Sequence, residues 1–177
     1  CLRTRSFDPI VLTLRKRAVA VSRPRADNQQ IYDENWPQWL DMKRHGPSSR
    51  WLRALIGDLL DGPLRGAEIK RVLDFGCGEG TTTGFLAHAL PSASVVGVDQ
   101  SGSGIDCARS HYRAANLEFR HQPGDASFGE ASFDLVTCFE VLEHVEDWQA
   151  LASRLAHATS RYLLVSFPTG RMRDFEV

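Results

Sequence analysis

The sequence contains few of the features that mark membrane, secreted or zinc-binding proteins. Its longest uninterrupted apolar stretches are a few residues long, whereas a membrane-spanning helix needs about 20. No small-residue cleavage site follows a long apolar core, which argues against a secretory signal. The four cysteines are widely scattered without a C-x-x-C pair, which argues against a disulfide framework or a zinc ribbon. We therefore expect a cytoplasmic protein with no membrane partner.

No charge of one sign dominates the chain either. The 22 acidic and 21 basic side chains leave a net charge of −1, so no global field draws the protein to nucleic acid, and such a partner is disfavoured. With 177 residues, of which 42% are apolar, the chain is long enough for one compact domain with a sizeable core. The composition leaves the oligomeric state open.

The first 27 residues differ in composition from the rest. Residues 1–25 carry seven basic side chains and one acidic side chain. Their short apolar patch, Ile10–Leu14, is followed at once by the basic run Arg15–Arg17, and short charge runs are usually solvated. We therefore expect residues 1–27 to be a basic N-terminal arm. Because the chain begins with Cys1, we also expect its natural start to be missing.

Residues 28–66 are predicted to form a helical cap. The aromatic side chains of Tyr32, Trp36 and Trp39 show no sustained period, and they could either cover a pocket or pad the edge of the core. After the break at Gly46-Pro47, Ser48 or Ser49 is expected to cap a helix. The apolar face of this helix repeats every three or four residues and comprises Leu52, Leu55, Ile56, Leu59 and Leu60.

From residue 67 onward the pattern alternates between strands and helices. The expected strands cover residues 69–75, 94–98, 117–120, 133–139 and 162–167, and the expected helices cover residues 81–90, 102–115 and 147–159. Strand and helix in repeated succession predict an α/β fold with a doubly wound, mostly parallel sheet and helices on both faces. Residues 67–177 are therefore expected to form the ligand-binding core.

The strongest functional signal is a glycine-rich turn between the first of these strands and its helix, with the sequence Asp74-Phe75-Gly76-Cys77-Gly78-Glu79-Gly80. In a doubly wound sheet such a turn lies at the carboxyl end of a strand, where ligands bind, and glycines let the backbone approach the ligand closely. A dinucleotide fingerprint would place its third glycine where Thr81 stands, so NAD is disfavoured. The Asp74 carboxylate suits a ligand with an ammonium group better than a pyrophosphate.

Two more acidic residues follow later strands. Asp99 ends the strand at residues 94–98, about 20 residues past the glycines, where a carboxylate can accept hydrogen bonds from two ribose hydroxyls. Asp125 stands beside the small residue Ala126, and its carboxylate can accept a hydrogen bond from an exocyclic amine. Each acid alone also fits an ordinary turn. Their order along one α/β pattern favours a nucleoside-binding site.

Together with the run Phe133–Val145, these segments resemble the class I S-adenosylmethionine-dependent methyltransferases. VLDFGCGEG resembles the first motif of that family, VVGVDQS its acidic ribose-binding loop, GDA its adenine-binding turn and FDLVTCFEVLEHV its fourth motif. The resemblance covers roughly residues 68–168. It implies a Rossmann-like methyltransferase fold that binds S-adenosylmethionine.

The resemblance also assigns cofactor-binding positions. The first motif would hold the methionine part, Asp99 the ribose, and Asp125 with Ala126 the adenine. Cys77 is interpreted as a small filler within the loop, because no histidine stands nearby to activate it. The expected cofactor-binding residues are Asp74, Gly76, Cys77, Gly78, Asp99, Gln100, Asp125, Ala126, Phe139 and Glu140.

Glu143 and His144 are the expected catalytic residues, because they follow the strand at residues 133–139 close to the expected methyl group. An oxygen acceptor benefits from a base that removes its proton, so His144 would orient or deprotonate an acceptor hydroxyl. The alternative is that His144 only packs against the following helix. Three ligands from one short segment seldom bind a metal ion without a fourth from elsewhere, so no metal is expected.

The run Glu140-x-x-Glu143-His144 is similar to that of quinone-biosynthesis O-methyltransferases. We therefore expect a methyltransferase that acts on an oxygen of a small-molecule acceptor. The same run resembles a stretch of small-RNA 2′-O-methyltransferases, although Pro168-Thr169 replaces the Pro-Asn found in that group. Two further functions are less favoured: an NAD-dependent oxidoreductase and a cofactor-binding module without catalysis.

The end of the sequence departs from the family pattern. The family fold closes with a helix and an antiparallel hairpin after the strand that corresponds to residues 162–167, but only ten residues follow Phe167 here. We expect that the C-terminal part of the protein, including the final antiparallel hairpin, is missing from this chain. The last strand would then be an unprotected edge of the sheet.

Overall fold

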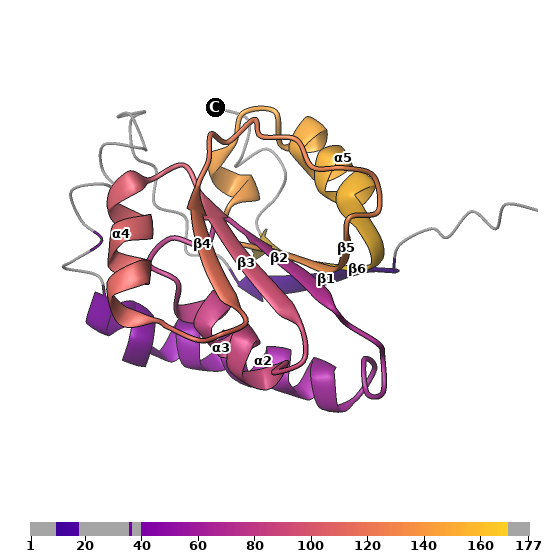
Figure 1. The fold of residues 1–177 in the computed structure, drawn as a ribbon. Helices are drawn as coiled ribbons and strands as arrows, with labels where there is room; N and C mark the ends of the chain where they lie inside the picture. The colour runs from indigo at the N-terminus through magenta and orange to yellow at the C-terminus, as the bar shows by residue number, and fades with distance from the viewer. Residues whose placement is uncertain (1–9, 18–35, 37–39, 170–177) are drawn as a thin grey trace, which may run out of the picture.

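The computed structural model describes residues 10–17, 36 and 40–169, and its strands form one six-stranded parallel sheet in the order β1-β6-β5-β2-β3-β4 (Figure 1). The strands are β1 (Ile10–Arg17), β2 (Arg71–Phe75), β3 (Ser94–Asp99), β4 (Leu117–His121), β5 (Phe133–Phe139) and β6 (Thr159–Thr169). The helices are α2 (Pro47–Asp61), α3 (Thr81–Ala89), α4 (Gly102–His111), α5 (Trp148–Ala158) and the short 3-10 helix η1 (Leu142–His144).

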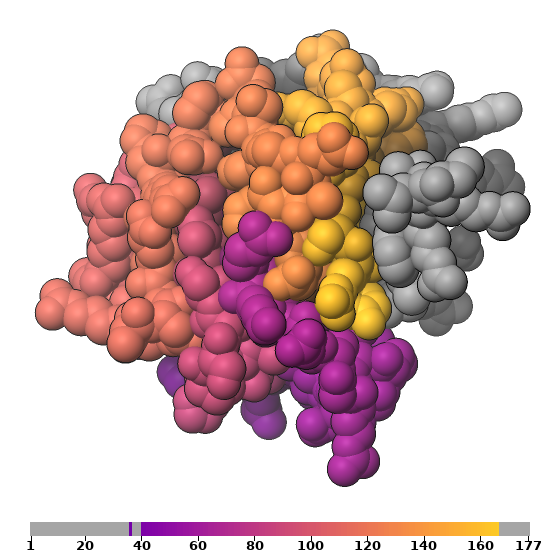
Figure 2. All heavy atoms as spheres, turned by 45° about the vertical axis from the view of Figure 1, so that its right-hand side comes forward, coloured from indigo at the N-terminus to yellow at the C-terminus, as the bar shows by residue number. Residues whose placement is uncertain are grey.

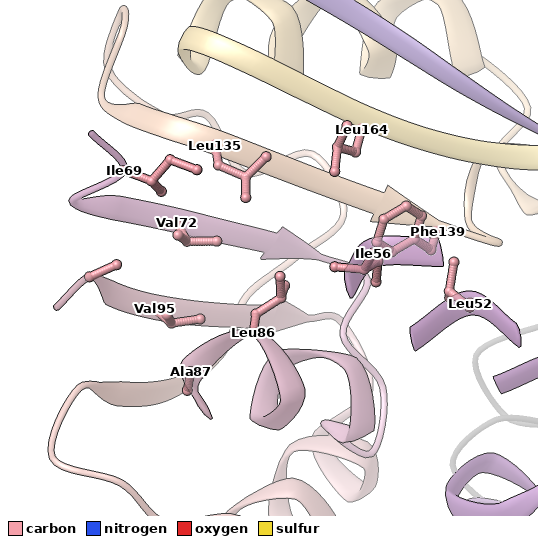
Figure 3. Packing of buried hydrophobic residues seen from close by; sticks show 11 residues of the cluster. Leu52, Ile56, Ile69, Val72, Leu86, Ala87, Val95, Leu135, Phe139 and Leu164 are labelled. Carbon is pink, nitrogen blue, oxygen red and sulfur yellow. The ribbon is translucent and has the colours of Figure 1, made fainter. Parts of the chain in front are cut away.

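The two faces of the sheet are covered by different helices. Helices α2 and α3 lie on one face and α5 lies on the other (Figure 1). Alternate residues of each central strand therefore enter different cores: Val72 packs toward α2 and α3, whereas Leu73 packs toward α5. Burial on both faces explains why the central strands are almost uninterrupted apolar runs. Figure 3 shows the first core, with Leu52 and Ile56 of α2 near the strand side chains.

The expected α/β organisation of residues 67–169 is confirmed. Strand β2 pairs with β3 on one side and with β5 on the other, so the chain reverses its direction of winding beside β2. In an open parallel sheet a ligand crevice forms at such a switch point, outside the carboxyl ends of the strands. The expected glycine-rich turn follows β2 directly and therefore lies in this crevice.

The opposite end of the sheet is closed by the segment between α2 and β2. Asp134 Oδ2 accepts hydrogen bonds from the backbone N–H groups of Lys70 and Arg71 at 2.8 and 2.9 Å. Figure 2 shows this end, with the segment before β2 in magenta against the orange chain around β5. The Asp134 carboxylate thus ties the starts of β2 and β5 together, away from the crevice.

The N-terminal arm contains a strand that the sequence analysis did not predict. Residues Ile10–Arg17 form β1, which pairs in parallel with β6 from Tyr162 to Thr169. The expectation that the last strand leaves an unprotected sheet edge is therefore wrong, because β1 pairs with the backbone groups of β6 along that edge. The remainder of the arm and residues 170–177 lie outside the described part of the chain.

The expected cap is helical where the structure describes it, over residues 40–45 and in α2. Leu52 and Ile56 are buried, which confirms the apolar face of α2. The expected serine cap is wrong: Gly46 is the N-cap residue, Pro47 occupies the first turn, and no side chain caps the helix. Among the described helices, none is long and apolar enough to cross a membrane.

Candidate functional site

A cavity of about 270 Å³ opens at the carboxyl ends of β2, β3 and β5. It is lined by the glycine-rich loop, the end of β3, the segment after β5 and the cap. Its lining residues include Trp36, Lys43, Ser48, Ser49, Leu52, Gly76, Cys77, Gly78, Glu79, Thr81, Asp99, Gln100, Ser101, Gln122, Gly124, Phe139, Glu140, Val141, Glu143 and His144. Most of the expected cofactor-binding residues belong to β2, β3, β5 or the turns that directly follow them.

Asp74 lies beneath the glycine-rich loop and does not line the cavity. Its side chain is buried, with Oδ2 accepting a hydrogen bond from Thr83 Oγ1 and Oδ1 accepting one from Thr137 Oγ1, both at 2.6 Å. Burial raises the pKa of Asp74 to about 6, although the two hydroxyl donors act in the opposite direction. Asp74 therefore links β2, α3 and β5, a structural role that the sequence analysis did not predict.

The glycine-rich loop is held against β3 by its own backbone. The N–H groups of Gly76 and Cys77 donate to Val98 O at 2.8 and 3.0 Å, and Gly76 and Gly78 both have positive φ angles of 74° and 52°. A Cβ atom at Gly76 would collide with Val141 Cγ2, so the glycine lets the loop touch the segment after β5. Burial raises the pKa of the Cys77 thiol well above its ordinary value, in agreement with the role of an inert filler.

Asp99 lines the cavity and joins two of its walls. Its Oδ2 accepts a hydrogen bond from Gly78 N at 2.7 Å, and its Oδ1 accepts one from Ser101 N at 2.8 Å. Gln100 follows at the cavity rim, where it is exposed. A carboxylate oxygen can accept more than one hydrogen bond, so these two backbone contacts do not by themselves prevent Asp99 from accepting one from a ligand hydroxyl.

Neither residue of the expected adenine-binding pair is among those that line the cavity. Asp125 is exposed and Ala126 is half-buried, while Gln122 and Gly124 of the same loop line the cavity instead. Arg154 of α5 fixes the loop by donating to Gly124 O at 2.9 Å and to Ala126 O at 3.1 Å.

Phe139 is the last residue of β5, Glu140 follows it directly, and both line the cavity. Phe139 is buried and also belongs to the core of Figure 3. Glu140 has a φ angle of 58°, a conformation that non-glycine residues seldom adopt. Its backbone N–H lies 3.1 Å from Ser166 Oγ and 3.4 Å from Ser166 O, so β6 holds it in place. This conformation lets the Glu140 side chain reach Lys43 Nζ, 3.6 Å from Oε2.

Glu143 and His144 lie on η1 and line the same cavity. His144 lies at the mouth and is open to solvent on one side. Packing of the remaining ring surface lowers its pKa, and the positive charge of Lys43 lowers it further, while Glu140 raises it. Within the described residues, no three histidine, cysteine or acidic side chains are grouped as metal ligands.

Two residues of the cap, Trp36 and Lys43, line the cavity. The sequence analysis did not single out Lys43, and for Trp36 it left open whether the ring covers a pocket or pads the edge of the core. Trp36 is buried, and its Nε1 donates to Ser101 Oγ at 3.0 Å. Its ring lies so close to Gly78 that a Cβ atom there would come within 2.5 Å of Trp36 Cη2. The aromatic content of the segment was the available signal, and at Trp36 the interpretation as a pocket cover agrees with the structure.

Several curated proteins similar to this chain are named as ubiquinone biosynthesis O-methyltransferases. An enzyme named ubiquinone biosynthesis O-methyltransferase from Coxiella burnetii is 40% identical over 90 residues, which are 49% of this chain and 38% of that protein. One of the same name from Actinobacillus pleuropneumoniae is 34% identical over 118 residues, which are 62% of this chain and 49% of that protein. The chain thus spans less than half the length of these relatives.

Solved structures share the fold at low sequence identity. The plantazolicin methyltransferase BpumL in complex with SAH has a TM-score of 0.59 and 19% identity, covering 77% of this chain and 57% of its own. A putative methyltransferase from Haloferax volcanii, solved with the activator Trm112, has a TM-score of 0.53 and 19% identity, covering 75% of this chain and 54% of its own. These similarities confirm the expected Rossmann-like methyltransferase fold.

The strands and the crevice lie within a stretch of sequence that matches a protein-family model. The family model described as "Methyltransferase domain" matches residues 72–161, from the start of β2 to the start of β6. That stretch is about half of the chain, and it contains the glycine-rich loop, Asp99, Glu140 and His144. This chain therefore belongs to the methyltransferase domain family.

Proposed function

We propose that this chain binds S-adenosylmethionine in the cavity and methylates an oxygen atom of a small molecule. One observation carries the proposal: the glycine-rich loop and Asp99 line the same cavity as Glu143 and His144. Groups suited to bind a nucleoside and a group suited to act as a base thus share one cavity. Several curated relatives are named as O-methyltransferases, which supports oxygen as the acceptor atom.

The cavity fits the cofactor at the level of its donor and acceptor groups. Gly76 and Gly78 leave the loop without side chains where a ligand would contact the backbone. Asp99 offers carboxylate oxygens to ribose hydroxyls, and Gln122 and Gly124 would flank the adenine. Buried Glu79 supplies a negative charge that suits an ammonium group, the role first expected of Asp74.

The remaining side chains account for the chemistry. When bound, the cofactor supplies a methyl group on a positively charged sulfur. His144 is uncharged near pH 7 because its pKa is lowered, so its ring nitrogen is available to take the proton from an acceptor hydroxyl. Glu140, whose negative charge raises the pKa of His144, would stabilise the resulting imidazolium, while Glu143 lines the same cavity. Phe139 and Val141 present apolar surface that excludes water from the reacting atoms.

A binding experiment tests the proposal. Calorimetric titration should show that S-adenosylhomocysteine binds and that NAD does not. Asp99→Asn should weaken the binding of S-adenosylhomocysteine by about 2 kcal/mol or more, because a charged acceptor of the ribose hydroxyls is lost.

The matched control is Asp106→Asn, because Asp106 is on α4 with a side chain that is 82% exposed. It should bind S-adenosylhomocysteine like the parent chain. Heat on titration with NAD and none with S-adenosylhomocysteine would overturn the proposal and favour an oxidoreductase.

A further inference from the structure

We propose that Lys43 is a positioning residue for His144. The Lys43 side chain comes from the cap, and its ammonium group is held at Glu140. The position of the cap therefore affects how readily His144 accepts a proton. The inference rests on the proposed function, because it gives that reaction's base a partner outside the sheet. The Lys43 side chain lines the same cavity as η1 but comes from the cap.

The cap holds Lys43 in place through its neighbours. Arg53 of α2 donates to Arg44 O at 2.6 Å and to Lys43 O at 3.4 Å, which fixes the end of the helical segment 40–45. Arg44 in turn donates from Nε to Tyr112 Oη at 3.1 Å, and its guanidinium lies 5.3 Å from the centre of that ring. Tyr112 Oη is 2.8 Å from Thr81 Oγ1, at the start of α3. These contacts fasten the backbone that carries the Lys43 side chain.

Glu140, the partner of Lys43, is also fixed in place. Its backbone has a left-handed conformation, and its N–H group donates to Oγ and O of Ser166, a fully buried residue of β6. Non-glycine residues persist in such conformations only where the surroundings hold them, and they are concentrated at functional sites. The result is an ion pair, 3.6 Å from Lys43 Nζ to Glu140 Oε2, that spans the cavity mouth from the cap to the end of β5.

An ion pair of this kind contributes little to folding. Both side chains are about one third exposed, and such pairs are weak in solution. Its location gives it a different effect, because both charged groups line the cavity that His144 also lines. Lys43 opposes protonation of His144, and Glu140 favours it. Glu143 lies on the same 3-10 helix as His144, and β6 contributes the uncharged Ser166 at this point. If the cap moved away, the positive charge of Lys43 would leave the surroundings of His144 and the negative charge of Glu140 would remain.

Nuclear magnetic resonance of histidine-labelled full chain tests the inference without an acceptor. The ring signal of His144 is assigned with His144→Gln and followed from pH 5 to 8 at low salt with saturating S-adenosylhomocysteine. In Lys43→Met the titration midpoint of His144 should rise by about half a pH unit, because a nearby positive charge is lost. Lys43→Arg should restore the parent midpoint.

Lys70→Met is the matched control, because Lys70 pairs with Glu68 at the far end of the sheet and both side chains are 71% exposed. It should leave the His144 midpoint unchanged. Glu140→Gln provides an independent arm with the opposite sign: its loss should lower the midpoint. This arm keeps the inference testable if Lys43→Met fails to fold.

Unchanged midpoints in both Lys43→Met and Glu140→Gln would overturn the inference. A parent chain that does not bind S-adenosylhomocysteine would instead contradict the proposed function, and the same titration without that ligand would still decide the role of Lys43.

Discussion

Trp36 Nε1 donates a hydrogen bond to Ser101 Oγ at 3.0 Å, and this contact connects the cap to the N-terminus of α4 across 65 residues of sequence. The same hydroxyl accepts from Gly104 N at 3.0 Å and so caps α4. The indole covers Gly78 from the side of the cap. One aromatic residue therefore fixes the cap, the glycine-rich loop and the start of α4 together.

We predict that Trp36→Phe lowers the free energy of unfolding by about 1 kcal/mol, because the hydrogen bond to Ser101 is lost while most of the ring contact is kept. Affinity for S-adenosylhomocysteine should fall several-fold, since the cap is then less firmly seated. Urea unfolding and calorimetric titration measure the two effects. Trp51→Phe is the control, because Trp51 is 45% exposed on α2, and it should change neither quantity. Equal behaviour of the two variants would contradict the role given to Trp36.

Gly78 is predicted to tolerate no side chain. Its φ angle is 52°, and a Cβ atom would lie 2.5 Å from the rigid ring of Trp36. Gly78→Ala should therefore cost the strain of the left-handed backbone, about 1 kcal/mol, and roughly a further 1 to 3 kcal/mol for displacing the indole. Binding of S-adenosylhomocysteine should be lost with it.

Gly66→Ala separates these two contributions. Gly66 also has a positive φ, of 76°, but a Cβ atom at this position would meet nothing within 4 Å. The variant should show the backbone cost alone, with ligand affinity unchanged. A Gly78→Ala chain that is as stable as Gly66→Ala, by urea unfolding, would show that the indole is not seated on the loop.

Asp74 gives a prediction for the pH dependence of stability. Burial raises its pKa in the folded chain to about 6, against an ordinary value near 3.8. Below pH 3.8 the group is protonated in both states and costs nothing. Between pH 3.8 and 6 the unfolded chain releases the proton first, so the folded state becomes progressively less favourable, by about 3 kcal/mol in total. Above pH 6 the difference is constant.

Asp74→Asn should remove this component, because asparagine does not ionise and can still hydrogen-bond to both threonines. The difference in unfolding free energy between the parent chain and Asp74→Asn, measured in urea from pH 4 to 7, should change in favour of the variant as the pH rises. Asp58→Asn, at an exposed position on α2, is the control. A difference that is flat over this range would mean that Asp74 ionises normally in the folded chain.

The contrast between Asp74 and Asp99 shows what the sequence could predict. Both stand at carboxyl ends of buried apolar strands, and local pattern alone predicted that both reach the crevice. Asp99 reaches the crevice, but the Asp74 carboxylate accepts hydrogen bonds from Thr83 and Thr137 inside the protein. Thr137 lies 63 residues away in the sequence. Whether a carboxylate faces a ligand or the interior depends on such long-range packing, which a pattern of residues does not contain.

The same distinction applies to the fold. Strands β2, β3 and β5 were predictable because each is a short, mostly apolar run closed by a glycine, a polar turn or a helix start. Strand β1 was not, because the basic run Arg15–Arg17 is typical of a solvated arm. The strand pairs with β6, more than 140 residues away in the sequence, and local sequence does not reveal such a pairing. Lys43 was missed for a related reason, since its partner Glu140 is far away in the sequence and adopts an unusual backbone conformation.

The last prediction concerns the pH dependence of turnover. The pKa of His144 is lowered by packing of its ring and by Lys43, so the uncharged base persists to a lower pH than an ordinary histidine near 6.5 allows. With any phenolic acceptor found by transfer of labelled methyl, the rate should rise with pH, reach half its maximum below pH 6.5 and stay level to pH 8. His144→Gln should lower turnover by about 100-fold and abolish this acid limb, while affinity for S-adenosylhomocysteine stays within about twofold. His157→Gln, at an exposed position on α5, should keep the parent profile.

Treatment with a chelator should have no effect on the rate, because His144 and not a metal ion removes the proton. Loss of activity on chelation, restored by a divalent ion, would contradict this assignment and favour the small-RNA type of methyltransferase.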